Sequence, residues 1–546
     1  MEKLKPKLFS VMKTYNKDQF VKDVIAGVIV AIIALPLSIA LALASGVTPE
    51  IGIYTAIVAG FIISFLGGSR VQISGPTAAF ATIVAGIVAE NGMEGLIVAT
   101  ILAGIFLILM GLFRLGTLIK FIPYTITTGF TSGIAITIAI GEIKDFLGLD
   151  VVSEEPIIHT IDKITSDIAF IHTINVQAVI VGMVCLAILI VWPKINNKIP
   201  PSLLAVIAGI ILVKGIGMEV NTIGDLYEIS NKLPTLSVPT FSYDMVQDLL
   251  PDAFTIAILA AIESLLSCVV ADSMIHSKHR SNMELVAQGV GNIGSALFGG
   301  IPATGAIART AANIKNGGRT PISGMVHSVT LLLILVVLMP YAALIPMPTI
   351  AAILFMVAYN MCEWRHFVYL CKTAPKSDII VLVTTFVLTI SFDLVIAIEV
   401  GMVLAAMLFL KRMSEVTAVE GWKYIDEEDD PESLELMKVP EGTRVYEISG
   451  PLFFGAADKI LQIGIHQNMK VLILRMRSVN AIDATAMHAL EELHSLCKEK
   501  DVQMIFSHVN EQPMSIMKKA EFDQKVGIEN FCIHINDALL RAEEIK

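Results

Sequence analysis

The stretch from residue 299 to 310 contains residue types suited to binding an anion inside a membrane. It reads Gly-Gly-Ile-Pro-Ala-Thr-Gly-Ala-Ile-Ala-Arg-Thr and lies between long apolar runs. A charge at the centre of a membrane helix costs about 2.5–3.5 kcal/mol, and Gly and Pro free backbone groups that lipid cannot satisfy. We therefore expect a half-helix that starts in mid-membrane beside Thr304 and Gly305, with Arg309 one turn further in. The alternative is a surface loop between two helices.

The composition sets the class of protein. Of the 546 residues, 55% are hydrophobic and 16% are charged, and the mean hydropathy is +0.72, whereas a soluble domain has about 25% charged residues. We expect a polytopic membrane protein. The net charge of −11 gives no indication of nucleic-acid binding. The cysteines show neither CxxC pairs nor metal-ligand spacing, so we expect reduced thiols, no metal and no cofactor.

The apolar runs predict fourteen membrane crossings. A spanning helix needs about 20 apolar residues, and two of the runs, 75–90 and 303–315, are interrupted and are counted as half-helices. The full candidate spans are 22–45, 50–68, 95–113, 118–140, 173–192, 201–217, 248–271, 283–299, 322–340, 343–361, 377–392 and 393–411. An even count places both termini on one side of the membrane.

The distribution of Lys and Arg orients these spans. The N-terminus is basic and lacks the apolar core and cleavage site of a signal peptide. If the spans alternate in direction from a cytoplasmic N-terminus, the inside connections hold most of the Lys and Arg residues. The outside connections hold only Lys144, Lys163, Lys214 and Lys232. The positive-inside rule therefore predicts a multi-pass protein of the inner (plasma) membrane with both termini cytoplasmic.

The two halves of the chain share a sequence pattern. Asp23 opens the first span and the Gly-Pro-Thr run at 75–77 follows, whereas Asp252 opens a later span and Pro302 follows at a similar distance. Two halves of seven spans form an inverted repeat, in which paired interrupted segments indicate the binding site of a secondary transporter. The alternative is that Gly and Pro breaks coincide by chance. The predicted boundaries are 1–21 for a cytoplasmic segment, 22–217 and 247–412 for the repeats, and 218–246 for an extracytoplasmic connection.

Both half-helices are expected to direct their N-termini at one point. A helix N-terminus carries about half a positive charge and several unpaired N–H groups, so two of them attract an anion. Arg309 adds positive potential, and Thr77 and Thr304 either cap the helices or donate to the ligand. The expected backbone donors lie at Thr77, Ala78 and Phe80 on one side, and at Gly305, Ala306 and Ile307 on the other.

These segments resemble the sulfate permease (SulP) family of anion transporters, and within it the bacterial DauA-type dicarboxylic acid transporters. The similar stretches are 35–38, 72–80, 129–134, 143–149, 261–267 and 305–313. The resemblance implies fourteen spans in a seven-plus-seven inverted repeat with core and gate domains. It also implies an anion between the third and tenth segments, near the first and eighth, and a homodimer.

The sequence departs from the family pattern at two places. A glutamine that binds the anion in some members corresponds here to Leu37. The sodium-coordinating residues of a bicarbonate symporter correspond to Glu263, Ser267 and Ile307. Ile307 has no side-chain oxygen, which puts sodium coordination in doubt.

Glu263 lies in the middle of an otherwise apolar run. An apolar environment disfavours the charged carboxylate, so we expect Glu263 to bind and release a coupled proton. The alternative is a static glutamate that braces the half-helix. Glu399 lies in the expected gate, and His327 is interpreted as structural.

The composition changes after Arg412. Residues 413–441 contain an acidic run and are predicted to be a linker. Residues 442–546 read as an α/β module that resembles the cytoplasmic STAS domain of SulP proteins, with a strand pair expected around Ser449-Gly450. Asp483 is expected to be a helix N-cap. Thr485 corresponds to a phosphorylated serine of anti-sigma-factor antagonists, and a plain helix start is the alternative.

Three classes of function compete. A secondary anion transporter accounts for the half-helices, Arg309 and the repeat together; the others are an exchanger or channel for sulfate, bicarbonate or chloride, and a membrane-tethered STAS regulator. No nucleophile–base constellation or nucleotide-phosphate loop occurs in the sequence, so we expect no enzyme. Leu37, Leu41, Phe80 and Ile307 predict an apolar pocket. Together with the DauA resemblance, this favours proton-coupled symport of a C4-dicarboxylate, with sulfate as the alternative.

Overall fold

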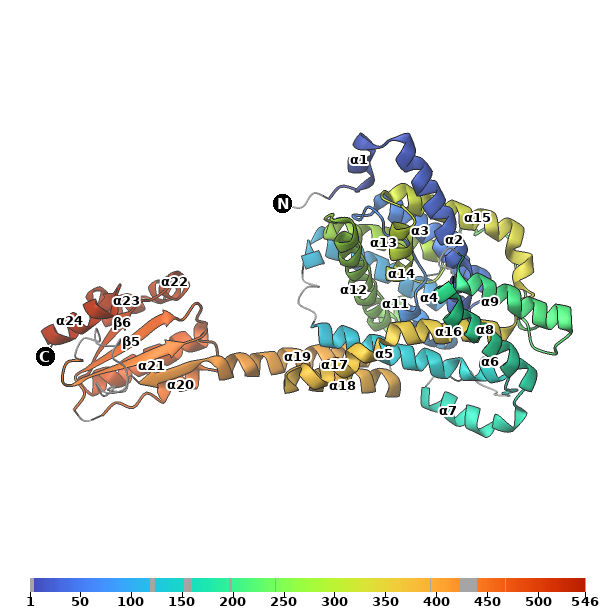
Figure 1. The fold of residues 1–546 in the computed structure, drawn as a ribbon. Coiled ribbons are helices and arrows are strands. Elements are labelled where there is room, and N and C mark those ends of the chain that lie inside the picture. Colours follow the sequence, from blue (N-terminus) through green and yellow to red (C-terminus); the bar gives the residue numbers. More distant parts are fainter. Residues whose placement is uncertain are drawn as a thin grey trace. The chain divides into compact units, whose positions relative to one another are not determined.

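The computed structural model describes residues 4–117, 123–151, 157, 160–195, 199–240, 242–392, 394–421, 439–466 and 468–545. The chain forms two compact units, Met1–Met402 and Val403–Lys546, which Figure 1 draws in blue to yellow and in orange to red. Each unit has its own core.

Each of the fourteen predicted segments contains helix. Among the described residues, eight helices are long and apolar enough to cross a membrane, and the remaining predicted segments lie in five further helices. Their bounds are α2 (Lys17–Ala44), α3 (Pro49–Leu66), η2 (Ala78–Phe80) continued by α4 (Ala81–Leu112), α5 (Tyr124–Gly141), α8 (Val176–Ile195), α9 (Pro201–Ile210) with its extension η5 (Ile211–Gly215), α12 (Leu250–Ile275), α13 (Ser281–Leu297), α14 (Ile307–Lys315), α15 (Pro321–Ala342), α16 (Met347–Cys362), α18 (Lys376–Ser391) and α19 (Leu394–Val416).

A glycine divides α4 into the half-helix and the following span. Gly92 has a positive φ of 66° and breaks the helical geometry, which glycine adopts without the steric cost of a side chain. The predicted segments 75–90 and 95–113 therefore lie on either side of a kink at Gly92, although the helix is nearly continuous.

Shorter helices precede or connect the spans and were not predicted. They lack long apolar runs, and their bounds are α1 (Leu8–Val11), η1 (Met12–Thr14), α6 (Ile143–Leu147), α7 (Thr160–Ala169), η4 (Ile171–Thr173), α10 (Ile223–Leu226), α11 (Tyr243–Asp248) and α17 (Trp364–Thr373).

The membrane helices pack in two groups. α13 packs on α3 and α4, α15 packs on α2 and α3, and α12 packs on α4 and α14, whereas α5 packs on α16 and α18, and α8 packs on α9 and α16. The first group corresponds to the expected core and the second to the expected gate.

Two short strands join the halves of the first unit. β1 (Ser74–Gly75) pairs antiparallel with β2 (Thr304–Gly305), with Ser74 opposite Gly305 and Gly75 opposite Thr304. Both strands are buried, so the backbone satisfies its polar groups inside the protein, as a non-helical segment at membrane depth requires. This rules out the surface-loop alternative for 299–310.

The second unit is a five-stranded sheet of order β3-β4-β5-β6-β7. β3 (Ala418–Gly421) is antiparallel to β4 (Thr443–Ser449), and β5 (Val471–Ser478), β6 (Gln503–Ser507) and β7 (Phe531–Cys532) continue in parallel. One core packs against α20 (Ala457–Leu461), α21 (Ala484–Glu499), α22 (Glu511–Lys519) and α23 (Phe522–Val526), and the second packs against α24 (Ile535–Ile545).

The expected strand pair around Ser449-Gly450 is wrong. The antiparallel partner of β4 is β3, and in the following segment Leu452 makes only an isolated bridge to Ile482. β3 lies inside the predicted linker 413–441, whose residues 422–438 lie outside the described part of the chain. The domain boundaries stay a prediction.

Candidate anion-binding site

The two half-helices start at the crossing of β1 and β2. η2 begins at Ala78, three residues after β1, and α14 begins at Ile307, two residues after β2. The first intrahelical bond of α14 runs from Thr310 N to Ala306 O (2.9 Å). The N–H groups of Ile307, Ala308 and Arg309 therefore have no acceptor within the helix. This arrangement places unpaired backbone donors of two helix starts at one crossing, as an anion site requires.

Three of the expected backbone donors are already used in this conformation. At the first half-helix, Phe80 N donates to Thr77 O (3.3 Å). The other two lie at the second half-helix. Gly305 N donates to Ser264 Oγ (3.2 Å), and Ala306 N donates to Ile73 O (2.9 Å). The available donors at the second half-helix are therefore the N–H groups of Ile307, Ala308 and Arg309, two residues further along than predicted. The backbone groups of Ala308 and Arg309 were not predicted as donors.

Helix α12 holds both half-helix starts from one side. Thr77 Oγ1 donates to Glu263 Oε2 (2.8 Å), and the hydroxyls of Ser264 and Thr304 are hydrogen-bonded at 2.6 Å. Neither threonine caps its helix with its side chain, because Thr77 makes no cap bond and the N-cap of α14 is Ala306. The capping interpretation of both threonines is therefore wrong.

Arg309 crosses from one half of the repeat to the other. Its side chain is 2% exposed, and Nη2 donates to Pro76 O (3.1 Å), just before the first half-helix. Among the described residues, Nε and Nη1 have no hydrogen-bond partner. A Cβ at Gly75 would lie 2.6 Å from Nη1, so the glycine leaves room for the guanidinium directly under β1.

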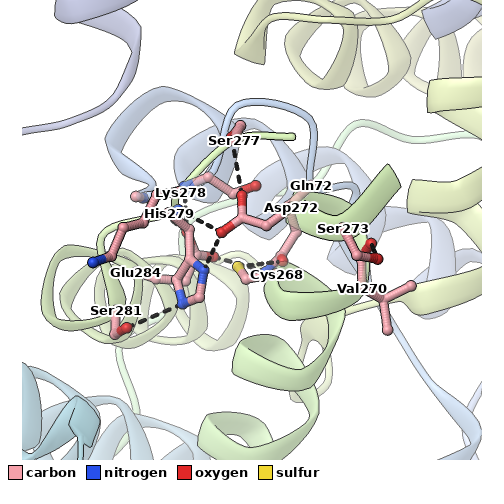
Figure 2. Close-up of polar contacts among 12 residues, drawn as sticks. Gln72, Cys268, Val270, Asp272, Ser273, Ser277, Lys278, His279, Ser281 and Glu284 are labelled. Carbon is pink, nitrogen blue, oxygen red and sulfur yellow. Dashed lines mark hydrogen bonds and ion pairs between the residues drawn. The ribbon is translucent and has the colours of Figure 1, made fainter. Parts of the chain in front are cut away.

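Glu284 fixes the extended segment that leads to the first half-helix. Its carboxylate is buried and accepts four hydrogen bonds, from Gly68 N (2.8 Å), Ser69 N (3.1 Å), Gln72 Nε2 (2.8 Å) and Gln288 Nε2 (3.0 Å). Cys268 Sγ of α12 donates to Gln72 Oε1 (2.8 Å), and Figure 2 shows this contact beside Glu284. Saturation with donors stabilises a buried carboxylate.

The second lead-in is held by amide and hydroxyl groups. Asn292 Oδ1 accepts from Ala303 N (2.8 Å) and its Nδ2 donates to Ala303 O (2.9 Å). Ser295 Oγ donates to Ile301 O (2.8 Å), and Thr55 Oγ1 accepts from Ile301 N (2.8 Å). Sequence reasoning missed this group, although Glu284, Gln288 and Asn292 recur every four residues along α13.

Asp272 near the end of α12, His279 in the connection and Ser281 at the start of α13 form a hydrogen-bonded row that the sequence did not reveal. His279 Nδ1 lies 2.8 Å from Asp272 Oδ2, and His279 Nε2 lies 3.0 Å from Ser281 Oγ (Figure 2). Asp272 also accepts from His279 N (2.7 Å) and Ser277 Oγ (3.0 Å). Asp272 therefore holds the α12–α13 connection through hydrogen bonds to both Ser277 and His279.

The remaining predicted residues vary in exposure. Thr77, Ala78, Phe80, Thr304, Ala306 and Leu41 are buried, whereas Glu263 and Leu37 are half-buried and Ile307 is 40% exposed. Leu37 and Leu41 lie on α2, which packs against α14 and α4. His327 is buried on α15 without a hydrogen-bond partner among the described residues. Glu399 is exposed on α19.

The candidate phosphosite and the predicted N-cap residue beside it lie in the second unit. Thr485 is exposed at the start of α21 in the second unit. Asp483 accepts from Ala486 N (2.8 Å), so its predicted N-cap role is confirmed. The described residues contain no cluster of three metal-ligating side chains.

A cavity of about 470 Å³ lies between the first half-helix and the gate group. It is lined by Thr82 and Ala85 of α4, Thr137 and Glu142 at the end of α5, and Lys163 of α7, among others. Core and gate are thus separated by open space beside the half-helix.

Comparison with known proteins places the chain in a family of membrane transporters. The model of the sulfate permease family matches residues 20–385, and the model of the STAS domain matches residues 436–538. The chain belongs to the sulfate permease family and is a polytopic anion transporter of that type.

Its relatives carry different substrates in their names. YvdB of Bacillus subtilis, assigned as a sulfate transporter, is 40% identical over 96% of this chain and 98% of its own length. The bicarbonate transporter BicA of Picosynechococcus is 30% identical over 95% of this chain and 94% of its own length. A murine anion transporter of the Solute Carrier 26 family, solved in the inward-facing state, shares the fold with a TM-score of 0.88 at 19% identity, over 99% and 94% of the two chains.

Proposed function

We propose that the chain moves its anion by secondary-active transport and binds it where β1 and β2 cross. The observation that supports this proposal most directly is that η2 and α14 begin within three residues of this crossing. Their first-turn N–H groups supply partial positive charge from two directions, and Arg309 adds a full one. Relative movement of the core and gate helix groups would alternate access to this point.

We propose a sulfate-class oxyanion, sulfate or bicarbonate, as the first substrate candidate. The names of YvdB and BicA support it. Backbone donors at helix starts suit a small oxyanion without a dedicated side chain.

A C4-dicarboxylate is the second candidate. Leu37 and Ile307, which are partly exposed, support it because they would pack against a carbon skeleton. This candidate also rests on the DauA resemblance.

Counterflow in proteoliposomes tests both candidates. Vesicles preloaded with unlabelled sulfate, bicarbonate or succinate are offered the corresponding labelled anion outside. Exchange of sulfate or bicarbonate supports the first candidate, and exchange of succinate alone supports the second. A passive flux that dissipates gradients without uphill accumulation would instead support an anion channel.

We propose Glu263 as the group that carries a coupled proton. Glu263 is half-buried. Its carboxylate accepts a hydrogen bond from Thr77 at the anion site and would change charge beside Arg309. Sodium coupling is less suited, since Ile307 supplies no side-chain oxygen at the third expected ligand position. An inward proton gradient should drive anion accumulation by the wild type, and Glu263→Gln should retain exchange but lose this accumulation. Undiminished accumulation by Glu263→Gln would show that Glu263 is a static brace.

We further propose a plasma-membrane location with both termini cytoplasmic, supported by the charge distribution of the loops. A homodimer remains a prediction of the family resemblance, and Thr485 remains a candidate phosphosite. Crosslinking of the full chain in membranes, and mass spectrometry of the native protein, test these two points. A purely regulatory STAS protein would behave alike with and without Arg309.

A further inference from the structure

Residues 4–22 form a segment whose exposed side carries several basic and apolar side chains and one acidic side chain, Asp18. Four lysines are exposed, and so are large apolar side chains from the same segment; they are Lys5, Lys13, Lys17 and Lys22, and Leu4, Phe9, Met12, Phe20 and Val21. None of the four lysines has a carboxylate within ion-pair distance among the described residues. We call these nine side chains the N-terminal basic face.

The segment is fixed to the membrane unit by its other side. Lys7 N donates to Gly67 O (2.8 Å), and Lys7 Nζ donates to Lys278 O (2.7 Å). Arg280 Nη1 donates to Lys5 O (2.6 Å), and Arg280 Nη2 donates to Ser10 Oγ (3.0 Å). These contacts hold the segment against the α12–α13 connection and leave the basic face pointing outward.

The cations of Lys7, Arg280 and Arg70 lie close to one another where the segment meets the membrane unit. Burial lowers the pKa of Lys7, and the positive charges of Arg280 and Arg70 lower it further, while Asp272 acts in the opposite direction. Arg70 makes no ion pair among the described residues, and its Nε has no hydrogen-bond partner there. Like charges held together without a contacting carboxylate favour an anion from outside the chain.

The apolar part of the face continues a membrane-spanning helix. The ring of Phe9 packs edge-on against that of Phe65 at the end of α3, with centroids 6.1 Å apart, and both rings remain partly exposed, at 47% and 37%. Met12 of η1, and Phe20 and Val21 in the first turns of α2, are also exposed. Lipid that contacts α3 would therefore also contact the N-terminal segment.

We propose that the N-terminal basic face and Arg70 bind anionic phospholipid at the membrane surface. The apolar side chains enter the boundary between headgroups and acyl chains, and the lysines and Arg70 contact the headgroup phosphates. A free anion would satisfy the charges alone, whereas a phospholipid also covers the apolar side chains. The bound lipid would fix the start of α2 and the lead-in 67–73, which connect to the anion site.

Titration of the full-length chain in mixed micelles tests the lipid proposal. Phosphatidylglycerol is added to the purified protein, retained lipid is counted by native mass spectrometry, and the midpoint of thermal unfolding is followed. Phosphatidylcholine and inorganic phosphate are the comparison ligands. We expect retention and thermal stabilisation with phosphatidylglycerol, and neither effect with phosphatidylcholine or with phosphate alone.

Charge variants locate the lipid site. Arg70→Gln and the triple variant Lys5→Gln/Lys13→Gln/Lys17→Gln should each weaken phosphatidylglycerol binding, by about fivefold for every charge removed. The matched control, Lys144→Gln/Lys214→Gln/Lys232→Gln, removes three exposed charges elsewhere and should bind as the wild type does. Unchanged unfolding midpoints in phosphatidylcholine micelles show that the variants are folded.

Three results would overturn the proposal. They are equal retention of phosphatidylcholine, equal stabilisation by inorganic phosphate, and an equal loss of binding in the control variant. The second would assign the cluster to a free anion.

Discussion

At the scale of single residues, Arg309 has two roles. The sequence predicted a source of positive potential, and the structure adds a hydrogen bond from Nη2 to Pro76 O in the opposite half. The side chain therefore both charges the site and ties the two half-helix starts together. Its buried position also explains why the Gly at position 75 is needed.

We expect Arg309→Ala to raise the apparent KM for the anion by about tenfold or more, because hydrogen bonds to charged groups contribute about 1.5–3 kcal/mol. Arg309→Lys should recover part of the affinity, since it keeps the charge but not the planar donor geometry. Initial-rate uptake in proteoliposomes measures both variants. An unchanged KM in Arg309→Ala would remove Arg309 from the site.

Cys497 gives a pH-dependent prediction in the second unit. Burial raises the pKa of its thiol to about 11, from the ordinary value of 9.0. A raised pKa means that folding favours the neutral thiol. This contribution to stability is therefore complete below about pH 9 and is lost as the pH rises toward 11.

We expect chemical denaturation of the second unit to show falling stability across this pH window. Cys497→Ala should show a smaller fall over the same range. An identical pH dependence in both proteins would contradict the assignment to Cys497.

At the scale of elements, the close approach of β1 to Arg309 determines which glycines tolerate a methyl group. In Gly75→Ala the new Cβ would lie 2.6 Å from Arg309 Nη1, so the guanidinium or the strand must move. We expect transport to fall and the unfolding midpoint to drop. Gly86→Ala on the same half-helix segment meets nothing within 4 Å and should leave both unchanged or raise the midpoint, because alanine favours helix.

Glu284 should act as a positioning residue for the first lead-in. Glu284→Gln replaces one of two acceptor oxygens by an amide donor, which faces a pair of N–H donors in either orientation of the amide. An unsatisfied buried group costs about 1–3 kcal/mol. We expect a lower unfolding midpoint and weaker anion binding. The exposed Glu94→Gln on α4 is the matched control, and an equal effect of both variants would contradict the positioning role.

At the scale of the whole molecule, the second unit should fold by itself. It has two cores of its own, and its edge strand β3 comes from residues 418–421. A fragment 414–546 should unfold cooperatively in denaturant, with retained helix and strand signals. A fragment 439–546 lacks β3 and should be less stable; equal stability of both would show that β3 is dispensable.

The sequence predicted the helices well and their long-range partners poorly. Apolar length and Gly-Pro interruptions are local signals, so each of the fourteen segments contains helix and both half-helix starts were found within a few residues. The strand pair at Ser449-Gly450 failed because a turn signal does not show which distant segment supplies the partner. The polar stripe Glu284, Gln288 and Asn292 was visible as a four-residue spacing, but its targets lie more than 200 residues away or across a loop.

The sequence alone thus showed a membrane protein with two interrupted helices in repeated positions. The reason is that the composition of each segment, and any Gly or Pro interruption in it, depends on whether the segment contacts lipid or water. Only the tertiary structure decided that β1 and β2 pair, that Thr77 bonds Glu263 and that Arg309 reaches Pro76. These contacts join residues separated by 186 to 233 positions, and such partners are selected by packing, which no local pattern encodes. The stretch around Arg309 becomes a site only where the other half of the chain meets it.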